Sequence, residues 1–265
     1  MSKVFKDKNY WALILGGSSG LGLATAKKLA IEGMNIFIVH RDRKSEFVEI
    51  EEHFNEIVSQ GVGFLSFNSD ALKPENRSQI ISEIKKKLEP NGKIRVLIHS
   101  IAKGNLKPMI SKNEPTLKND DFHLTIEAMA VSLYDWTQEL FNNNLFSPDA
   151  RVLSFTSEGN QKVWKNYAAV SAAKVALEAI TRNIALEFAQ FGIRANCVQA
   201  GITDTQSFRM IPGSEQLMAL TKNRNPFKRL TRPEDAANVI YLLTLDEASW
   251  INGAIIPADG GEHIS

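Results

Sequence analysis

The stretch WALILGGSSGLGLA, residues 11–24, joins an apolar run to a glycine-rich turn and then to the start of a helical pattern. The run at 11–15 has the length and composition of a buried strand. Glycines let the backbone approach an anion closely, and the free N–H groups of the following helix favour a pyrophosphate. The spacing departs from G-x-G-x-x-G, because Thr25 stands where the third glycine would be. The residues expected to contact the pyrophosphate are Gly16, Ser18, Ser19, Gly20, Leu21 and Gly22.

Glycines also end strands for purely structural reasons, so the context of this turn decides how it is interpreted. Strand-like runs are expected at 11–15, 35–39, 62–67, 94–98, 151–155, 194–198 and 254–256. Helical patterns are expected at 21–32, 47–60, 76–88, 120–141 and 167–191. Such alternation is typical of right-handed βαβ units on a parallel sheet. The sequence therefore predicts a doubly wound, Rossmann-type α/β fold with a seven-stranded parallel sheet flanked by helices, and residues 1–265 are expected to form a single domain.

The overall charge and composition exclude several kinds of partner. The 31 basic and 30 acidic residues give a net charge of +1, which offers no general attraction to nucleic acid or to an anionic membrane. No run approaches the roughly 20 apolar residues of a membrane span, and residues 1–8 lack an apolar signal-peptide core. Because Cys197 is the only cysteine, no intrachain disulfide can form. We therefore expect a soluble cytoplasmic protein.

The segment YAAVSAAK, residues 167–174, places a phenol and an ammonium seven residues apart at the opening of a helical pattern. Seven residues at about 100° each return to within roughly 20° of the starting direction, so both side chains lie on one helix face. A phenol can donate a hydrogen bond to a developing oxyanion, and a nearby ammonium lowers the pKa of the phenol. Tyr167 and Lys174 are therefore candidate catalytic residues. A tyrosine that begins a helix beside a solvated lysine is the alternative.

The residues after the second expected strand, His40-Arg41-Asp42-Arg43, bear on the choice of cofactor. An acidic residue about 20 positions beyond the glycines binds the ribose diol of NADH, whereas arginine accommodates the 2′-phosphate of NADPH. Arg41 and Arg43 therefore favour NADPH over NADH, and Asp42 argues the other way. A solvated charged turn is the alternative interpretation.

Several features together resemble the short-chain dehydrogenase/reductase family over essentially the whole chain: the spacing of the glycine turn, Asp70 after the third strand, the serine-rich stretch 154–157, and Tyr167 with Lys174. Most members of that family place the tyrosine four residues before the lysine, but that position here is Val170. The seven-residue spacing resembles enoyl-acyl-carrier-protein reductases. HSIA at 99–102 and TSEG at 156–159 are also similar to that branch.

The resemblance implies hydride transfer from NADPH to C3 of a trans-2-enoyl thioester in fatty acid elongation, with Tyr167 on the thioester oxygen and Lys174 on the nicotinamide ribose. It also implies a homotetramer, a substrate carried by acyl carrier protein, and no metal. Besides the glycine turn, Arg41, Arg43 and Lys174, the residues that it assigns to the cofactor are Asp70, Ala71, Ser100, Ile101, Ala102, Gly201, Thr203 and Thr205. The residues that we expect to contact the substrate are Ser157, Tyr167, Phe208 and Met210.

Departures from the family pattern affect this assignment at three positions. Glu127 stands where ordinary members keep a catalytic asparagine, and Ser157 stands where many enoyl reductases have a second tyrosine. Ile202 replaces the usual proline of the loop on the nicotinamide side. We therefore expect that a proton relay through asparagine is absent or altered, that the geometry at 201–205 is changed, and that any accessory hydroxyl role falls to Ser157. A serine that simply finishes a strand is an equal alternative.

The stretch 202–232 is too long for an ordinary connection in such a fold, and we expect it to form a mobile lid that binds the substrate. An acyl chain would be covered by its apolar residues, Phe208, Met210, Ile211, Leu217, Met218 and Leu220. An acidic carrier protein would dock on its basic residues, Arg209, Lys222, Arg224, Lys228, Arg229 and Arg232. Solvated loop charge is the alternative for this basic cluster.

Other functions remain compatible with these residues. A 3-ketoacyl reductase or another carbonyl reductase of the same family would use the same cofactor, and a 2,4-dienoyl thioester reductase would share the chemistry. A non-catalytic NADPH-binding regulator would keep the glycine turn. The spacing of Tyr167 and Lys174 argues against the carbonyl reductases, and the presence of both residues argues against the regulator.

Overall fold

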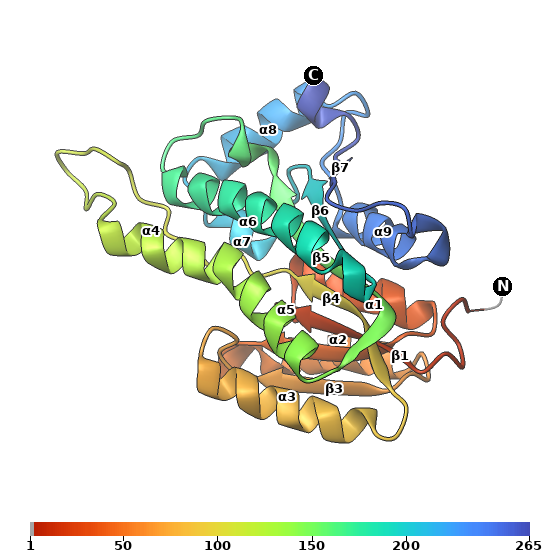
Figure 1. Ribbon diagram of the computed structural model, residues 1–265. Coiled ribbons are helices and arrows are strands. Elements are labelled where there is room, and N and C mark those ends of the chain that lie inside the picture. The colour runs from red at the N-terminus through yellow and green to blue at the C-terminus, as the bar shows by residue number, and fades with distance from the viewer. Residues whose placement is uncertain (1–2) are drawn as a thin grey trace.

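Parallel strands form one seven-stranded sheet in the computed structural model, which describes residues 3–265 (Figure 1). Their order is β3-β2-β1-β4-β5-β6-β7, so the chain winds outward from β1 in both directions. The strands are β1 (Tyr10–Leu15), β2 (Asn35–His40), β3 (Phe64–Asn68), β4 (Lys93–His99), β5 (Phe146–Ser157), β6 (Ile193–Ala200) and β7 (Ile255–Ala258). The predicted doubly wound fold with a seven-stranded parallel sheet is therefore confirmed.

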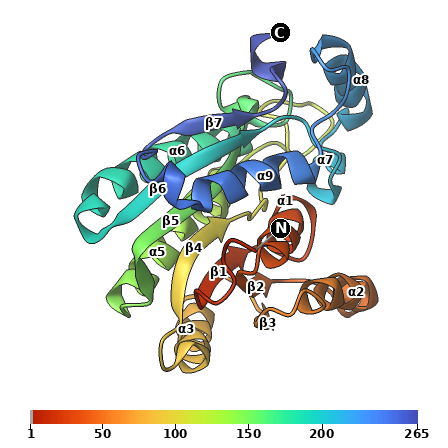
Figure 2. The same ribbon diagram turned by 90° about the vertical axis from the view of Figure 1, so that its right-hand side faces the viewer.

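Helices cover both faces of the sheet, because consecutive strand residues point to opposite faces and both faces are apolar. Leu13 and Leu97 point to one layer of helices, and Ile14 and Ile38 point to the other. The helices of the first layer are α3 (Pro74–Leu88), α5 (Ser132–Asn142) and α6 (Ala168–Glu187). Those of the second are α1 (Gly20–Ile31), α2 (Phe47–Val58) and α9 (Pro233–Thr244). Figure 2 shows α1 and α9 on the side of the sheet opposite α5 and α6.

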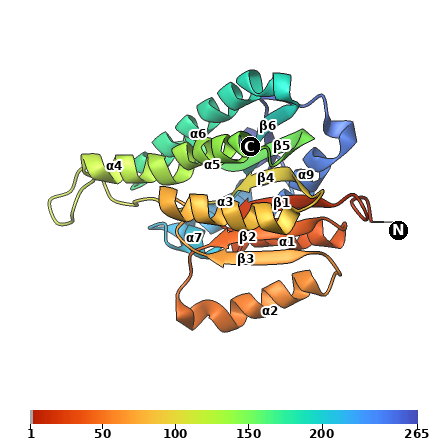
Figure 3. The same cartoon turned by 60° about the horizontal axis from the view of Figure 1, so that its bottom comes forward.

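Shorter helices and turns lie mainly at the ends of the strands and helices. The segment 101–118 has no helix or strand and projects from the body of the molecule (Figure 3). The shorter α-helices are α4 (Asn119–Ile126), α7 (Gln206–Arg209) and α8 (Ser214–Arg224). A π turn at Glu127–Val131 joins α4 to α5. The 3-10 turns are Lys44–Glu46, Glu158–Asn160, Ala189–Phe191, Asp246–Ala248 and Glu262–Ile264.

The helices differ from the expected ones at several places. The helix expected at 120–141 is interrupted by the π turn, and the stretch 202–232 contains α7 and α8 instead of being a plain loop. Helix α9 was not predicted, although Pro233 at its first position and Asp235, which accepts a hydrogen bond from the Arg232 N–H, are ordinary signals of a helix start.

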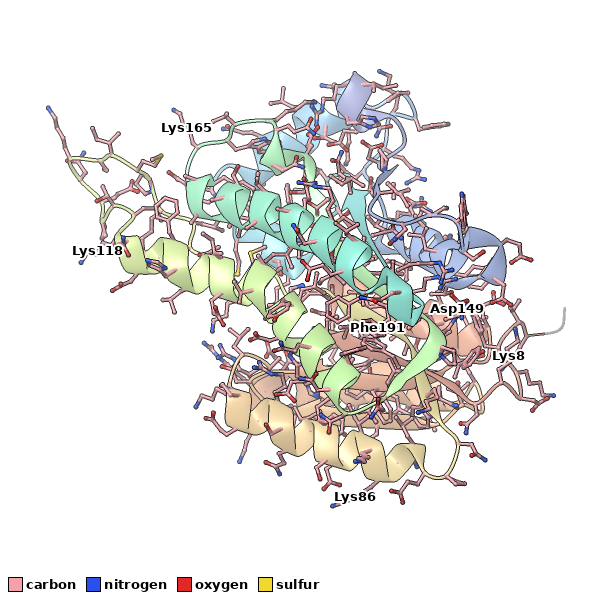
Figure 4. The ribbon with its side chains drawn as sticks, in the orientation of Figure 1. Lys8, Lys86, Lys118, Asp149, Lys165 and Phe191 are labelled. Carbon is pink, nitrogen blue, oxygen red and sulfur yellow. The ribbon has the colours of Figure 1, made fainter. Side chains whose placement is uncertain are left out.

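A cluster of arginines, of which Arg95 and Arg151 are buried, lies at the amino ends of β4, β5 and β6. The Asp149 carboxylate accepts hydrogen bonds from Arg95 at 2.6 Å, from Arg151 at 2.5 Å, and from Arg194. Burial alone would raise the pKa of Asp149, but these guanidinium groups lower it. Arg95 and Arg151 also donate to the carbonyl groups that end α9, where the helix dipole favours cations. Figure 4 shows Asp149 on the side of Lys8, away from Lys165.

Candidate active site

A cleft with a volume of about 440 Å³ crosses the carboxyl ends of six strands, β1 to β6. In a doubly wound sheet, ligands bind beyond the carboxyl ends of the strands, at the point where the strand order reverses. Here that point lies between β1 and β4. Of the residues singled out in the sequence, the following line it: Gly16, Ser18, Ser19, Gly20, Leu21, Arg41, Asp70, Ala71, Ser100, Ile101, Ala102, Ser157, Tyr167, Lys174, Gly201, Thr203, Thr205 and Phe208. Gly22, Arg43 and Met210 are not among the lining residues.

The glycine turn brings backbone close to backbone at the floor of the cleft. Gly16 has a φ of +80°, and a Cβ there would lie 2.6 Å from the Ser100 carbonyl oxygen. A Cβ on Gly22 would lie 2.1 Å from the Gly16 oxygen, so Gly22 is required for packing and makes no contact with the cleft. Ser19, which precedes α1, makes no side-chain cap, and the first turn of α1 carries no acidic residue. These first N–H groups therefore suit an anion.

The far end of the cleft, beyond β2 and β3, carries two carboxylates that are each matched to a basic side chain. Arg41 donates to Asp70 at 2.6 Å, and His40 Nδ1 lies 2.7 Å from Asp42 Oδ2. Burial would raise the pKa of Asp70, but the Leu72 N–H and Arg41 together lower it. Arg43 is exposed and uses its N–H to bind Glu46. Arg41 is therefore the arginine that faces this end of the cleft.

Tyr167 stands directly before α6, and its ring lies against the backbone of the turn after β5. A Cβ on Gly159 would lie 2.5 Å from the Tyr167 ring, so a glycine is needed for this contact. Burial raises the pKa of Tyr167, and the neighbouring Ser157 hydroxyl offsets part of this rise. Within residues 3–265 the Ser157 Oγ is buried and has no hydrogen-bond partner of good geometry. Both hydroxyl groups therefore remain available to a ligand.

Lys174 is buried in the floor of the cleft without a carboxylate on its ammonium. Its side chain is 9% exposed and donates to the Phe155 carbonyl at 2.7 Å. Burial lowers the pKa of Lys174 to about 8, although the negative charge of Glu178 acts in the other direction. The Glu178 carboxylate itself accepts from Thr156. A buried cation with spare donors is suited to hold polar groups of a ligand.

His99, at the end of β4, ties this strand to the π turn. Its Nε2 lies 2.8 Å from Ser132 Oγ, and the Ser132 hydroxyl donates to the Ala128 carbonyl. Because that donation uses the only hydroxyl proton, Nε2 carries the hydrogen. Burial and the charge of Lys174 lower the pKa of His99 to about 3, so the ring is neutral. A π turn within a helix frequently lies near a functional site.

Comparison with known proteins assigns this arrangement to a family. A family model described as Enoyl-(Acyl carrier protein) reductase matches residues 16–263. This chain is a member of that short-chain dehydrogenase/reductase family. A Bacillus subtilis (strain 168) protein named "Probable 2,4-dienoyl-CoA reductase [(2E)-enoyl-CoA-producing]" is 30% identical over 96% of each chain. The Enterococcus faecalis (strain ATCC 700802 / V583) enoyl-[acyl-carrier-protein] reductase [NADH] FabI is 26% identical over 98% of this chain and 99% of its own.

A solved structure of similar fold is the enoyl-[acyl-carrier-protein] reductase (NADH) from Aquifex aeolicus VF5. Its TM-score is 0.83 at 23% identity, and the match covers 99% of this chain and 98% of that one. At this identity the likeness shows the fold alone. The family assignment establishes an oxidoreductase that uses a nicotinamide cofactor.

The position of Glu127 differs from what the family pattern predicted. Glu127 is exposed on the π turn and does not line the cleft, whereas Met129, two residues later, is buried and does. The change at Ile202 has a different explanation. Its N–H donates to Glu262 at 3.2 Å, a bond that the usual proline of this short-chain dehydrogenase/reductase family has no N–H to make.

The substrate end of the cleft is more apolar than the expected residues alone indicated. Met210, which is 72% exposed, does not line it, whereas Phe208 does. Ile211 and Leu217, which were expected to cover an acyl chain, also line it. The apolar lining residues that were not expected are Leu106, Met129, Trp164 and Val170. Trp164 and Leu106 lie in segments without a regular pattern, so their sequence gave no periodic signal for a contact with the cleft.

Half of the basic cluster expected to dock a carrier protein is neutralised by ion pairs within this chain. Arg209 pairs with Asp204, and Arg229 pairs with Asp235. Arg224 donates to both Glu158 and Glu262, so it joins α8 to the turn after β5 and to the C-terminal turn. The exposed cations of this cluster with no ion pair among residues 3–265 are Lys222, Lys228 and Arg232.

Neither a metal-binding group of side chains nor a membrane-spanning helix is found in the described part of the chain. Residues 3–265 contain no group of three or more metal-ligating side chains arranged to hold a metal ion. No helix among them combines the length and hydropathy needed to span a bilayer.

Proposed function

We propose that this protein reduces the C2–C3 double bond of trans-2-enoyl thioesters with NADPH. One observation carries the proposal. Tyr167 stands directly before α6 and seven residues before Lys174, and the position four before the lysine is Val170. All three residues line the cleft. The tyrosine position that serves most carbonyl reductases of the family is therefore occupied by an apolar side chain, and the acidic hydroxyl enters from the start of the helix.

The cleft has the features that a dinucleotide requires. The uncapped start of α1 and the close-packed glycines suit the pyrophosphate, and Thr205 faces Gly20 across the cleft, with its Cγ2 3.4 Å from where a Cβ would be. Ser100, Ile101 and Ala102 would line the cofactor cleft, and Arg41 and Asp70 would meet the adenosine end. NADPH supplies the hydride when it is bound.

Tyr167 would act as the donor to the thioester oxygen, where negative charge collects during reduction. Because burial raises its pKa, the phenol keeps its proton at neutral pH. A preorganised donor of this kind lowers the barrier by about 3 to 4 kcal/mol. Lys174 would hold the hydroxyl groups of the nicotinamide ribose and supply positive potential beside the phenol. Ser157 would provide a second hydroxyl contact to the substrate.

The apolar end of the cleft supports an acyl substrate. Trp164, Met129 and Phe208 offer apolar surface for a lipid-like tail. None of the three carries a charge that would bind a small acid. For the thioester carrier we propose acyl carrier protein, docked by Lys222, Lys228 and Arg232. Because the other arginines of the cluster are paired, this electrostatic contribution is small.

A 2,4-dienoyl thioester reductase is the second candidate. It is favoured by the 30% identity to the Bacillus subtilis protein whose name carries that activity. The same donors at Tyr167 and Ser157 would serve a conjugated diene, so an assay that compares the two substrates is needed to distinguish the two candidates.

The test is NADPH oxidation by the purified protein with three thioesters of matched length: trans-2-enoyl, 2,4-dienoyl and 3-ketoacyl. Turnover of the enoyl thioester at least about tenfold above the others is expected. Preferential turnover of the dienoyl thioester would select the second candidate, and turnover of the ketoacyl thioester alone would overturn both.

We also propose that the protein assembles as a homotetramer. Exposed apolar side chains on and after α6, Leu186 and Phe191, and Trp250 beyond α9 support additional contacts. Sedimentation velocity at micromolar concentration is expected to give a single tetrameric species, and a monomer would contradict the proposal.

A further inference from the structure

The adenosine end of the cleft contains an acidic residue at a position that ordinarily selects NADH. Asp42 follows β2 directly after Arg41, and a carboxylate there binds the ribose diol and repels a 2′-phosphate. Both residues line the cleft. The preference for NADPH therefore depends on what prevents the Asp42 carboxylate from reaching the ribose.

The Asp42 carboxylate is held by the residue two positions before it. His40 Nδ1 lies 2.7 Å from Asp42 Oδ2, and because an ionised carboxylate can only accept, Nδ1 is the donor. The Asp42 backbone is also fixed, since its N–H donates to Asn68 Oδ1 at 3.0 Å and its carbonyl accepts from Asn68 Nδ2 at 3.2 Å. The Asp42 side chain is 22% exposed.

The histidine is itself fixed in place. Its side chain is 6% exposed, and its ring packs edge-on against Phe54 of α2, with ring centroids 5.4 Å apart. A buried ring with one orientation can hold a carboxylate without loss of further side-chain entropy. His40 therefore sits between the core and the cleft, with Asp42 as its contact on the cleft side.

We propose that His40 determines the cofactor preference by holding Asp42 away from the ribose, which leaves Arg41 as the group that meets a 2′-phosphate. The inference rests on the proposed use of NADPH. Asp42 released from His40 would turn toward the ribose diol, repel the 2′-phosphate and compete for the guanidinium of Arg41. Asp70 does not compete in the same way for the ribose, because it accepts from the Leu72 N–H as well as from Arg41.

Equilibrium binding of NADPH and NADH to the apo protein tests this directly, measured by calorimetry without substrate. His40→Leu removes the donor and keeps the volume, and it is expected to lower the ratio of NADPH to NADH affinity by about tenfold, the effect of one charge-assisted hydrogen bond. His40→Asn places an amide donor at the position of Nδ1, and it is expected to keep the ratio within about threefold of the wild type.

Asp42→Ala supplies a second test that leaves the buried ring untouched. Alone it is expected to change the ratio by less than about threefold, because the carboxylate is already held back. Combined with His40→Leu it is expected to restore the wild-type ratio, which is the signature of coupling between the two residues. The inference would be overturned by an unchanged ratio in His40→Leu, or by a rise of tenfold or more in Asp42→Ala alone. Equal binding of both cofactors by the wild type would instead overturn the proposed cofactor.

Discussion

Buried cations lie at both ends of the strands, and the two groups differ in what surrounds them. At the amino ends, Arg95 and Arg151 are almost fully buried and share the Asp149 carboxylate. At the carboxyl ends, Lys174 is also buried, but within residues 3–265 its ammonium has only the Phe155 carbonyl as its acceptor. The first group joins β4, β5 and α9, whereas the second faces a cleft.

The difference separates a structural role from a functional one. A buried charge that is paired and fully hydrogen-bonded holds elements together, and removal of its partner is costly. A buried cation without a carboxylate partner is destabilising in the free protein, and it is kept because a ligand supplies the missing contacts. Replacement of Asp149 should therefore lower the free energy of unfolding, whereas replacement of Lys174 should raise it.

The largest effect is expected at Asp149. Asp149→Ala leaves the buried Arg151 without a carboxylate and Arg95 with only that of the exposed Asp246, so the free energy of unfolding should fall by about 3 to 5 kcal/mol. Urea denaturation measures the change. Asp246→Ala is the matched control, because its exposed carboxylate also pairs with Arg95 and should contribute about 1 kcal/mol or less. Equal losses in the two variants would contradict the structural role of the Asp149 cluster.

Tyr167→Phe should remove catalysis without affecting cofactor binding. The hydroxyl acts on charge that develops only during the reaction, so the single-turnover rate of enoyl reduction should fall by about 10²- to 10³-fold. The affinity for NADPH should change by less than about twofold. A variant that retained the full single-turnover rate would exclude the proposed donor role.

Replacement of Lys174 should stabilise the free protein while it weakens function. The folded pKa of about 8 lies below the ordinary 10.5, so the charged form costs about 3 kcal/mol at neutral pH. Lys174→Met removes this penalty but leaves the Phe155 carbonyl without a partner, at a cost of about 1 to 3 kcal/mol. A net gain of up to about 2 kcal/mol is expected at pH 7, together with weaker NADPH binding.

The pH dependence of this gain follows from proton binding. Between pH 8 and 10.5 the unfolded chain holds a proton at Lys174 that the folded chain has lost, so the wild type gains stability as pH rises. The advantage of Lys174→Met should therefore shrink between pH 7 and pH 9.5. An advantage that stayed constant would show that burial does not penalise the ammonium.

The smallest effect is expected from the unpaired surface cations. Lys222→Ala with Lys228→Ala should raise the Michaelis constant for a carrier-linked enoyl substrate by about two- to threefold at low salt, and by less at high salt. The coenzyme-A substrate should be less affected. Lys85→Ala with Lys87→Ala removes the same charge from α3 and serves as the control. Equal effects of the two pairs would leave no docking role for this surface.

The fold could be predicted from sequence because its signals are local. The apolar run at 11–15, the glycine turn and the alternation of periods each depend on neighbouring residues. The same holds for Tyr167 and Lys174, whose spacing on one helix brings them to one cleft. Helix α9 also carries local signals, at Pro233 and Asp235, so the sequence alone suffices to predict it.

Contacts between distant segments could not be predicted in the same way. Arg224 lies in a basic cluster in the sequence, yet its partners Glu158 and Glu262 are far from it along the chain and come together only in the fold. The bond from Ile202 to Glu262 has the same character. The π turn that buries Met129 and exposes Glu127 shifts the side chains by one position, which no helical periodicity indicates.

The close contact between Gly159 and the Tyr167 ring limits which residues can replace Gly159. A methyl group at 159 would meet the ring at 2.5 Å and push the phenol out of place. Val163, four residues later in the same loop, is 99% exposed and touches little. In a saturation library selected for growth on the activity, position 159 should return glycine almost alone, while position 163 should accept nearly every residue. Neighbouring positions of one surface loop would thus evolve at very different rates.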